Sequence, residues 1–314
     1  MVTQYKERDF SVEPLVIGTR GSPLAVSQAE ETRDRLMKAH SMSFGSFRIE
    51  IIKTTGDKIQ DRPLSEIGGK GLFTEEIENS LISGAIDIAV HSMKDMPTQL
   101  PAGLGITAIL PREDVRDSFV SRKYRSIKEL PVGSTVGTSS LRRRAQLLAL
   151  RPDLKVVEFR GNVQTRLRKL DDGIADATFL ACAGLSRLEL KELINPIPIN
   201  EMLPAVSQGA IGIEQNLEDD LIRDFVSLIT DKNAEIQLKA ERAFLTDLDG
   251  SCRTPIGGYA EILGEELKFH GEIVKPDGSE TFKGVWRGGL SEATELGKHA
   301  AKVLKEKGGT GFFE

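Results

Sequence analysis

Cysteine and histidine are scarce in this chain of 314 residues. It has two cysteines, Cys182 and Cys252, and four scattered histidines. Two cysteines cannot form a disulfide framework, and no Cys/His spacing matches a zinc site. The sequence therefore predicts a protein of a reducing compartment that carries no metal ion.

Long apolar runs are also missing. No segment approaches the roughly 20 apolar residues that span a bilayer, and residues 1–13 lack the apolar core of a signal peptide. We therefore expect no membrane association and a cytoplasmic protein. The plastid stroma, reached after removal of a transit segment, is the alternative. The sequence suggests no role for residues 1–14.

Net positive charge and aromatic residues are both lacking. The formal net charge is -5, and aromatic residues make up 5% of the chain. This balance argues against a general nucleic-acid binder, whose surface needs a broad basic patch. Any basic patch must then be local, which favours a small anionic ligand.

The chain is long enough for two or three domains. Near its start, Leu15–Gly18 reads as a buried strand, followed by a helix over about 24–38 with Ser22 as N-cap and Pro23 at its first position. The expected apolar face of this helix consists of Leu24, Ala25, Ala29, Leu36 and Met37. A strand that turns directly into a helix presents free N–H groups and the positive end of the helix dipole to an anion.

This arrangement recurs later in the chain. Ser134–Ser140 leads into Leu141–Gln146, and Ile17-Gly18-Thr19 aligns with Val136-Gly137-Thr138. A second echo links residues 81–87 to residues 170–176, and each of these segments precedes an apolar strand. Two α/β domains of like construction would explain the pairs, although strand–Gly–helix turns are common enough to recur by chance.

The last quarter of the chain has a different pattern. A helix is expected over Asn233–Asp247, with Ile236, Ala240, Ala243 and Phe244 on one face. Turn residues then separate three candidate strands, which are Gly258–Leu263, Leu267–Val274 and Thr281–Trp286. A last helix, capped by Ser291, reaches about Lys307. The pattern predicts a small α+β domain with a three-stranded antiparallel sheet.

Basic residues recur at strand ends and turns, several of them beside Gly, Ser or Thr. They are Arg20, Lys70, Lys94, Arg142, Arg143, Arg160, Arg166 and Arg187. Arginine suits bidentate binding of carboxylate or phosphate, although a single such residue is usually a solvated surface group. Arg142 and Arg143 begin a helix, where cations oppose the dipole, which favours a ligand over a structural role. Gly68-Gly69-Lys70-Gly71 lacks the spacing of a nucleotide-binding loop.

Two further positions carry reactive groups. Asp95 follows Lys94 in a loop after an apolar strand, where α/β proteins usually bind ligands. It could act as an acid or base or stabilise a developing cation, but a structural Lys–Asp contact fits the spacing equally well. Cys252 lies between Gly250 and Arg253, and a neighbouring cation favours the thiolate. Cys182 lies in an apolar run and reads as a core residue.

Taken in order, these segments resemble the porphobilinogen deaminase family over nearly the whole chain. The matching motifs are Gly18–Ala25, Gly68–Phe73, Val90–Pro97, Gly137–Arg143, Arg160–Arg166, Leu203–Ala210 and the cysteine loop Asp249–Pro255. Each motif alone is moderately specific, whereas the ordered set is very specific.

The resemblance implies two α/β domains similar to the lobes of solute-binding proteins, flanking a cleft, and a third domain that carries the cofactor cysteine. Domain 1 would comprise residues 1–110 and 211–228, domain 2 residues 115–205 and domain 3 residues 232–314. The family's dipyrromethane primer is linked through a thioether to the cysteine that matches Cys252.

The resemblance also implies roles for individual residues. The catalytic group would comprise Asp95, Lys94 and Arg20. The residues that hold the cofactor would be Cys252, Ser92, Lys94, Asp95, Thr138, Ser140, Arg142, Arg143 and Gly161. The residues that bind substrate carboxylates would be Arg20, Ser22, Lys70, Arg160, Arg166 and Arg187.

The implied reaction joins four molecules of porphobilinogen head to tail into hydroxymethylbilane, with loss of ammonia at each step. A growing polyanion would account for the local cations in a chain of negative net charge. We expect a monomer that binds this small substrate and neither nucleic acid nor membrane. A solute-binding protein and a nucleic-acid-binding regulator are the rival interpretations.

Overall fold

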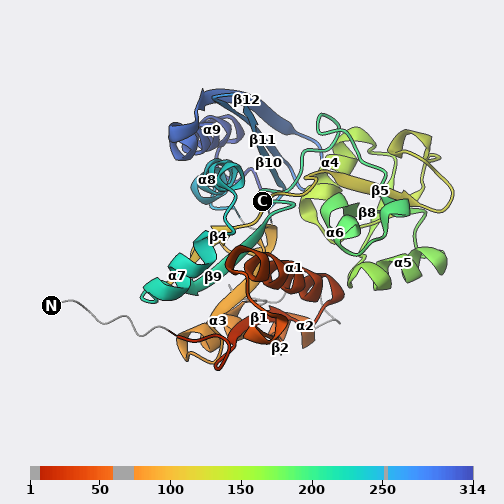
Figure 1. Ribbon diagram of the computed structural model, residues 1–314. Helices are drawn as coiled ribbons and strands as arrows, with labels where there is room; N and C mark the ends of the chain where they lie inside the picture. The colour runs from red at the N-terminus through yellow and green to blue at the C-terminus, as the bar shows by residue number, and fades with distance from the viewer. Residues whose placement is uncertain (1–7, 59–73, 251–253, 314) are drawn as a thin grey trace. The chain divides into compact units, whose positions relative to one another are not determined.

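The computed structural model describes residues 8–58, 74–250 and 254–313 (Figure 1). Lys70 and Cys252 lie outside the described residues. The described chain divides into two compact units. The first unit takes in residues 8–58, 74–112 and 210–235, and the second takes in residues 113–209, 236–250 and 254–313.

The first unit is built on a five-stranded sheet of order β2-β1-β3-β9-β4. Its strands are β1 (Leu15–Arg20), β2 (Phe47–Ile52), β3 (Ile88–Ser92), β4 (Leu104–Ile109) and β9 (Ile211–Asn216). Strand β1 pairs in parallel with β2 and β3, whereas β9 runs antiparallel to β3 and β4. Its helices are α1 (Pro23–His40), α2 (Thr55–Lys58), α3 (Glu75–Ile82) and α7 (Asp220–Ser227).

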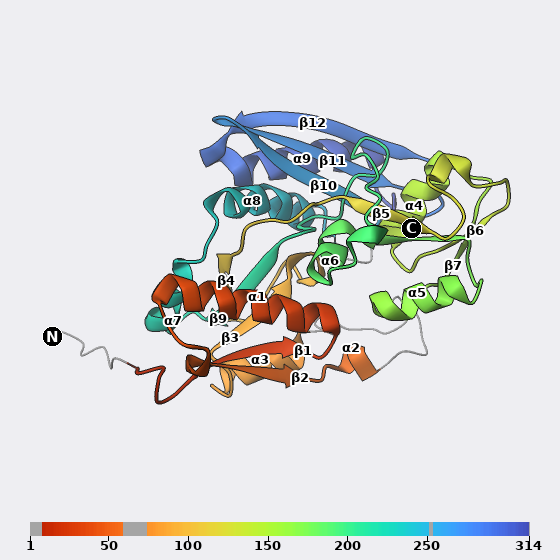
Figure 2. The same ribbon diagram turned by 45° about the vertical axis from the view of Figure 1, so that its right-hand side comes forward.

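Alternation along β1 divides the core of this unit into two layers. Leu15 and Ile17 pack with residues of α1 and α7, which include Leu36 and Phe225. Val16 points to the other face and packs against Ile77 and Leu81 of α3. Successive strand side chains face opposite sides, so helices cover both faces, and Figure 2 shows α1 and α3 on either side of β1.

The start of α1 is as expected, but its buried face is not. Ser22 caps the helix by accepting a hydrogen bond from the Ala25 N–H, and Pro23 occupies the first turn. The buried residues are Gln28, Ala29, Thr32 and Leu36. Of the expected apolar face, Ala29 and Leu36 are buried, Met37 is half-buried and packs against the same core, and Leu24 and Ala25 are only half-buried. Thr32 can be buried because its hydroxyl donates to the Gln28 carbonyl at 2.9 Å, so no polar group is left unpaired.

The second unit holds a four-stranded sheet of order β5-β8-β6-β7. Its strands are β5 (Asp117–Ser121), β6 (Thr135–Gly137), β7 (Lys155–Val157) and β8 (Ala177–Ala181). Leu147 of α4 (Leu141–Leu150) packs on one face. Residues of α5 (Val163–Asp171) and α6 (Cys182–Arg187) pack on the other face.

The two sheets repeat one topology, which confirms the internal repeat. Strand β1 lies between parallel neighbours β2 and β3, and β6 lies between parallel neighbours β7 and β8. Next in each sheet comes an antiparallel strand, β9 beside β3 and β5 beside β8. The matched segments of sequence are therefore equivalent elements of two α/β sheets.

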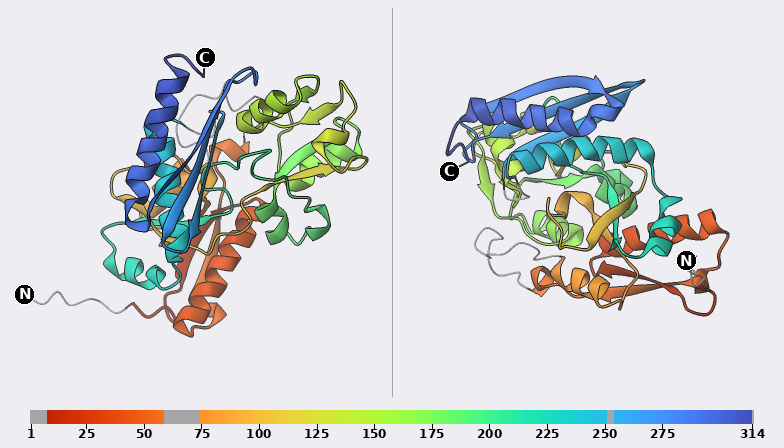
Figure 3. Two further views of the ribbon diagram at one scale, coloured as in Figure 1. Left: turned by 90° about the horizontal axis from the view of Figure 1, so that it is seen from above. Right: turned by 90° about the vertical axis from the view of Figure 1, so that its left-hand side faces the viewer.

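The second unit also contains the expected antiparallel meander, of β10 (Ile256–Leu263), β11 (Glu266–Val274) and β12 (Thr281–Gly289). Gly264 and Gly278 form its turns with φ of 66° and 79°, a region that favours glycine. Both views of Figure 3 show α9 (Ala293–Gly308) along this sheet. Gly297 lets α9 approach α8 (Lys232–Asp247), because a Cβ there would lie 2.1 Å from the Ala240 carbonyl oxygen.

Two details of the last quarter differ from expectation. Ser291 does not cap α9, because it lies inside a 3-10 turn, η5 (Leu290–Glu292), and Glu292 is the N-cap. In α8, Ala240 and Phe244 are buried and Ile236 packs against the same core as expected, but Ala243 is only half-buried. The remaining short helices are η1 (Phe44–Ser46), η2 (Met93–Asp95), η3 (Ile127–Glu129) and η4 (Lys191–Leu193).

Candidate active site

The carboxyl edge of the first sheet gathers one set of the predicted residues. Parallel pairing sets Ile17 opposite Ile88, so β1 ends at Arg20 beside the end of β3 at Ser92. The short helix η2 then carries Lys94 and Asp95. In open α/β sheets this edge is where ligands bind. Ser22 follows β1 directly and caps α1 at the same edge.

Met93 anchors the loop that carries Asp95. Its side chain is 1% exposed, and its N–H donates to the Ala210 carbonyl at 3.0 Å. It fills the space above Gly212 in β9, where a Cβ would come within 2.1 Å of the sulfur. With Met93 held inward, Asp95 is exposed and Lys94 half-buried. The Asp95 carboxylate is therefore open to a ligand.

Behind this loop lies a buried cluster that the sequence did not reveal. His91 Nε2 lies 2.9 Å from Glu214 Oε2, and the two side chains are 5% and 0% exposed. Burial raises the pKa of nearby Glu78, and the Glu214 carboxylate raises it further. The two partners of the pair lie 123 residues apart in sequence, so no local spacing could have indicated it.

The carboxyl edge of the second sheet gathers another set of predicted residues. Strand β6 leads into Thr138, which is buried, and Ser140, which caps α4 by accepting from the Arg143 N–H at 3.4 Å. Arg160 and Gly161 follow β7 at the same edge, because β6 and β7 are parallel. Gly161 has φ of 116°, a backbone conformation that residues with a Cβ atom rarely adopt.

The other predicted arginines of this unit differ in how their side chains are engaged. Arg160 Nη1 is buried and has no hydrogen-bond partner among the described residues. Arg166 Nε donates to the Gly161 carbonyl at 2.9 Å. Arg187, in the last turn of α6, donates through both terminal nitrogens to the Gly209 carbonyl at 3.3 Å. A buried N–H without a partner is costly, so Arg160 suits an anionic ligand.

Arg142 and Arg143 share one buried carboxylate, that of Asp117 in β5. Arg142 Nη2 donates to Asp117 Oδ2 at 2.7 Å, and Arg143 Nη2 donates to Oδ1 at 2.6 Å. The three side chains are 7% exposed or less. Burial alone would raise the pKa of Asp117, but the two guanidinium charges and the hydrogen bonds from Arg143 and Gln208 hold it well below its usual value.

The triad of Asp117, Arg142 and Arg143 explains in part why two cations are tolerated at the start of α4, where they oppose the helix dipole. Asp117, the acid that balances these cations, lies in strand β5, 25 and 26 residues away from them in sequence. Asp117 is thus a residue of the site that sequence reasoning missed. Its position in an apolar strand next to Arg116 carries no signal, since the contact forms only across the sheet.

The structure describes one of the two cysteines, Cys182. Cys182 begins α6 and is 1% exposed, as expected of a core residue. Burial raises the pKa of its thiol to about 12, with Asp114 and Asp117 acting in the same direction. A thiol with that pKa is protonated at neutral pH and is a poor nucleophile. Cys252 lies outside the described residues.

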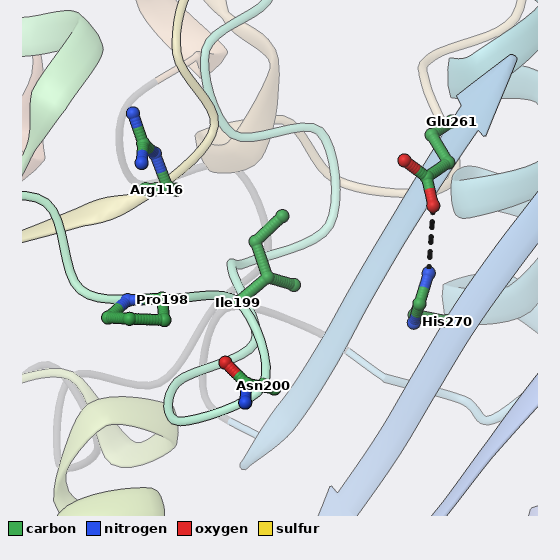
Figure 4. A pocket seen from close by; sticks show the side chains of 6 residues that line it. All are labelled: Arg116, Pro198, Ile199, Asn200, Glu261 and His270. Atoms are coloured by element: carbon green, nitrogen blue, oxygen red, sulfur yellow. Dashed lines mark hydrogen bonds and ion pairs between the residues drawn. The ribbon is translucent and has the colours of Figure 1, made fainter.

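A separate cavity of about 400 Å³ lies in the second unit, and none of the predicted site residues that the structure describes lines it (Figure 4). Its charged side chains already have partners, because Arg116 pairs with Asp114 at 2.7 Å and Glu261 accepts from His270 at 3.2 Å. Burial would raise the pKa of Glu261, but Lys268 and His270 hold it below its usual value.

Residues 8–58, 74–250 and 254–313 contain no group of three His, Cys, Asp or Glu side chains that could hold a metal ion. In the same part of the chain, no helix has both the length and the apolar character to cross a bilayer.

Comparison with known proteins identifies the family. Residues 15–224 match the model "Porphobilinogen deaminase, dipyromethane cofactor binding domain", and residues 236–306 match "Porphobilinogen deaminase, C-terminal domain". The porphobilinogen deaminase of Paracoccus denitrificans is 56% identical over 302 residues, which cover 96% of each chain. That of Nitrobacter winogradskyi is 55% identical over 298 residues, covering 95% of this chain and 94% of its own.

Similar solved structures include a lipoprotein and a periplasmic substrate-binding protein. Immunogenic lipoprotein A from Vibrio vulnificus is 11% identical with a TM-score of 0.44, covering 70% of this chain and 96% of its own. A periplasmic substrate-binding protein of an ABC transporter from Coxiella burnetii is 13% identical with a TM-score of 0.43, covering 68% and 91%.

The family matches decide between the interpretations of the sequence, because they extend over both the α/β part and the C-terminal part of the chain. The chain belongs to the porphobilinogen deaminase family, and it is a hydroxymethylbilane synthase, a transferase that acts on porphobilinogen with a dipyrromethane cofactor.

Proposed function

We propose that Cys252 carries the dipyrromethane cofactor through a thioether and that Asp95 is the catalytic carboxylate, with Lys94 and Arg20 beside it. The observation that carries this proposal is the match of the chain to both models of the family, with Asp95, Lys94 and Arg20 inside residues 15–224 and Cys252 inside residues 236–306. The chemistry of the cysteines supports it, since the other thiol, Cys182, is buried and has a pKa raised to about 12.

Eight residues besides Cys252 would hold the cofactor. These residues are Ser92, Lys94, Asp95, Thr138, Ser140, Arg142, Arg143 and Gly161. One observation fits an anionic group there: Arg142 Nε is a buried donor without a partner among the described residues. The cofactor, when bound, supplies the pyrrole carbon that attacks the incoming substrate unit.

Asp95 acts on the substrate. When the C–N bond of the aminomethyl group of porphobilinogen breaks, ammonia leaves and positive charge develops on the substrate ring. An exposed carboxylate fixed at the end of β3 by Met93 stabilises that charge, because a preorganised partner needs no reorganisation at the moment of reaction. Lys94 and Arg20 lie at the same sheet edge and attract the acid groups of the substrate.

The remaining cations bind the acetate and propionate groups of the substrate and of the growing chain. They are Arg20, Arg160, Arg166 and Arg187, with Lys70, and Ser22 adds a hydroxyl. Guanidinium groups suit this task because they bind carboxylates with two parallel hydrogen bonds. Successive pyrroles present their acids at new positions, which requires several arginines.

The organisation of the protein follows from the same family. Domain 1 comprises residues 1–110 and 211–228, domain 2 residues 115–205 and domain 3 residues 232–314. We propose a cytoplasmic monomer that binds neither nucleic acid nor membrane. The bacterial origin of the relatives supports the cytoplasm over a plastid. Light scattering after gel filtration tests the monomeric state, and fractionation of cells tests the location.

Intact-mass spectrometry tests the cofactor attachment. Wild-type protein should carry the mass of two pyrrole units, and Cys252→Ala should have the bare sequence mass, a native circular dichroism spectrum and no activity. The matched control, Cys182→Ala, should keep the adduct. An adduct on Cys252→Ala, or its loss from Cys182→Ala, would show that the assignment is wrong.

A further inference from the structure

Asp117 lies at the centre of a fixed set of contacts around Arg142 and Arg143. Besides their bonds to its two oxygens, the arginines donate to backbone carbonyls, with Arg142 Nη1 at 2.7 Å from the Leu203 oxygen and Arg143 Nη1 at 2.8 Å from the Phe179 oxygen. Both guanidinium groups are thereby held from two sides, so neither can turn without breaking a buried hydrogen bond.

The position of Asp117 is itself fixed by a neutral side chain. Gln208 Nε2 donates to Asp117 Oδ1 at 3.0 Å and to the Val115 carbonyl at 2.7 Å. Gln208 is 1% exposed and Asp117 is 0% exposed. The carboxylate therefore has one available position, and the arginines take theirs from it.

The charges within these direct contacts do not balance. Two guanidinium groups face one carboxylate, which leaves one positive charge in a buried place at the start of α4. The helix dipole adds to the preference for an anion there. The next carboxylate, Glu272 of β11, is reached only through Gln146, which accepts from Arg142 Nη1 and donates to Glu272 Oε2, both at 3.0 Å. Burial raises the pKa of Glu272, against the opposite effect of the Lys283 and Arg142 charges.

We propose that Asp117 is a positioning residue, which holds Arg142 and Arg143 in the one arrangement that leaves a single net positive charge for a carboxylate of the cofactor. The inference rests on the proposed roles of the two arginines in cofactor binding. Without Asp117, two neighbouring cations repel each other and turn apart, and the anion site loses its shape. Asp117 itself touches neither cofactor nor substrate.

The variant that tests this is Asp117→Asn, which keeps the size of the side chain and removes its charge. The measurement is the ratio of protein with the two-pyrrole adduct to bare protein, by intact mass, in the fraction that elutes as folded protein and unfolds cooperatively in urea. We expect the ratio to fall about tenfold or more, as for other small displacements of binding groups. A purely structural role would lower stability but leave folded protein with the wild-type ratio.

Gln208→Leu provides a second variant that keeps every charge. It removes one anchor of Asp117, so we expect folded protein with a smaller fall in the adduct ratio. The matched control is Asp114→Asn, which breaks the more exposed pair with Arg116 in the same segment and should leave the ratio unchanged.

The outcomes separate the two proposals. A wild-type protein without adduct contradicts the proposed function. If wild-type protein carries the adduct and folded Asp117→Asn has the same ratio of adduct-bearing to bare protein, only the role of Asp117 is overturned. If Asp117→Asn yields no folded protein, Gln208→Leu at the wild-type ratio overturns it instead.

Discussion

Asp176 holds Thr135 at the start of β6 by two hydrogen bonds. The Thr135 N–H donates to Asp176 Oδ2 at 2.9 Å, and the Asp176 N–H donates to the Thr135 carbonyl at 2.8 Å. Asp87 does the same for Val16 in β1, at 2.7 Å and 3.0 Å. The two aspartates are equivalent in the internal repeat, and each fixes the beginning of the strand that leads to the site.

Replacing Asp176 should destabilise the second unit without changing its chemistry. Asp176→Ala leaves the Thr135 N–H without its partner, which costs about 1–3 kcal/mol. Urea unfolding measures the loss, and the adduct mass should be unchanged. The control is Asp172→Ala, at an exposed position nearby, which should change stability by less than about 0.5 kcal/mol. Equal stabilities for the two variants would contradict the role of Asp176.

Asp95→Asn should slow turnover and leave the fold intact. Loss of a preorganised electrostatic partner costs about 2.7–4 kcal/mol, or about a hundred- to a thousandfold in kcat. Because Asp95 is exposed, urea unfolding should give a nearly unchanged free energy. Glu30→Gln, at an exposed position on α1, is the control. Near-normal turnover of Asp95→Asn would exclude the catalytic role.

The arginines outside the triad should act at different lengths of the product chain. Arg20→Leu, Arg160→Leu and Arg166→Leu each remove one carboxylate partner, a loss of about 2–5 kcal/mol where the pair is buried. Intact mass after a limited supply of porphobilinogen should show enzyme-bound chains that stop at different lengths. Arg122→Leu, which breaks the exposed pair with Asp171, should give the wild-type pattern. That same pattern in all three variants would mean that these arginines are surface charges.

Arg143→Leu should behave differently, because it acts on stability as well as on the cofactor. It removes the donor that lies 2.6 Å from Asp117 Oδ1 and leaves a buried carboxylate with one cation fewer. Breaking a buried pair in this way costs about 3–5 kcal/mol. The urea midpoint should fall well below that of Arg166→Leu. Equal midpoints would show that the triad contributes little to the fold.

Cys182 should resist alkylation in the native protein. Its pKa is raised to about 12, so at pH 8 the folded protein holds the thiol protonated and buried, while the unfolded chain, with a pKa of about 8.5, ionises in part. Iodoacetamide should therefore add to Cys182 only after unfolding, as peptide mass mapping would detect. The folded state binds this proton more tightly, so stability should fall as the pH rises from about 8.5 to 12. Rapid alkylation of native Cys182 would contradict its burial.

The sequence by itself determined the local features that short-range forces decide. The cap by Ser22, the proline at the start of α1, the turns at Gly264 and Gly278 and the meander depend on periodicity and on hydrogen bonds between near neighbours. The internal repeat was visible for the same reason, since each copy is a strand, a turn and a helix in sequence. The motifs that flank these turns also carried the resemblance to the family.

Tertiary structure alone decided the contacts that cross the sheets. Asp117 meets Arg142 and Arg143 because β5 lies beside β8 in a sheet that also holds β6, and Glu214 meets His91 because β9 returns to lie beside β3. Gln28 and Thr32 are buried on α1, although neither belongs to its expected apolar face. Packing and the need to pair every buried polar group determine such partners. Because these residues lie far apart in the chain, their contacts produce no periodic pattern in the sequence.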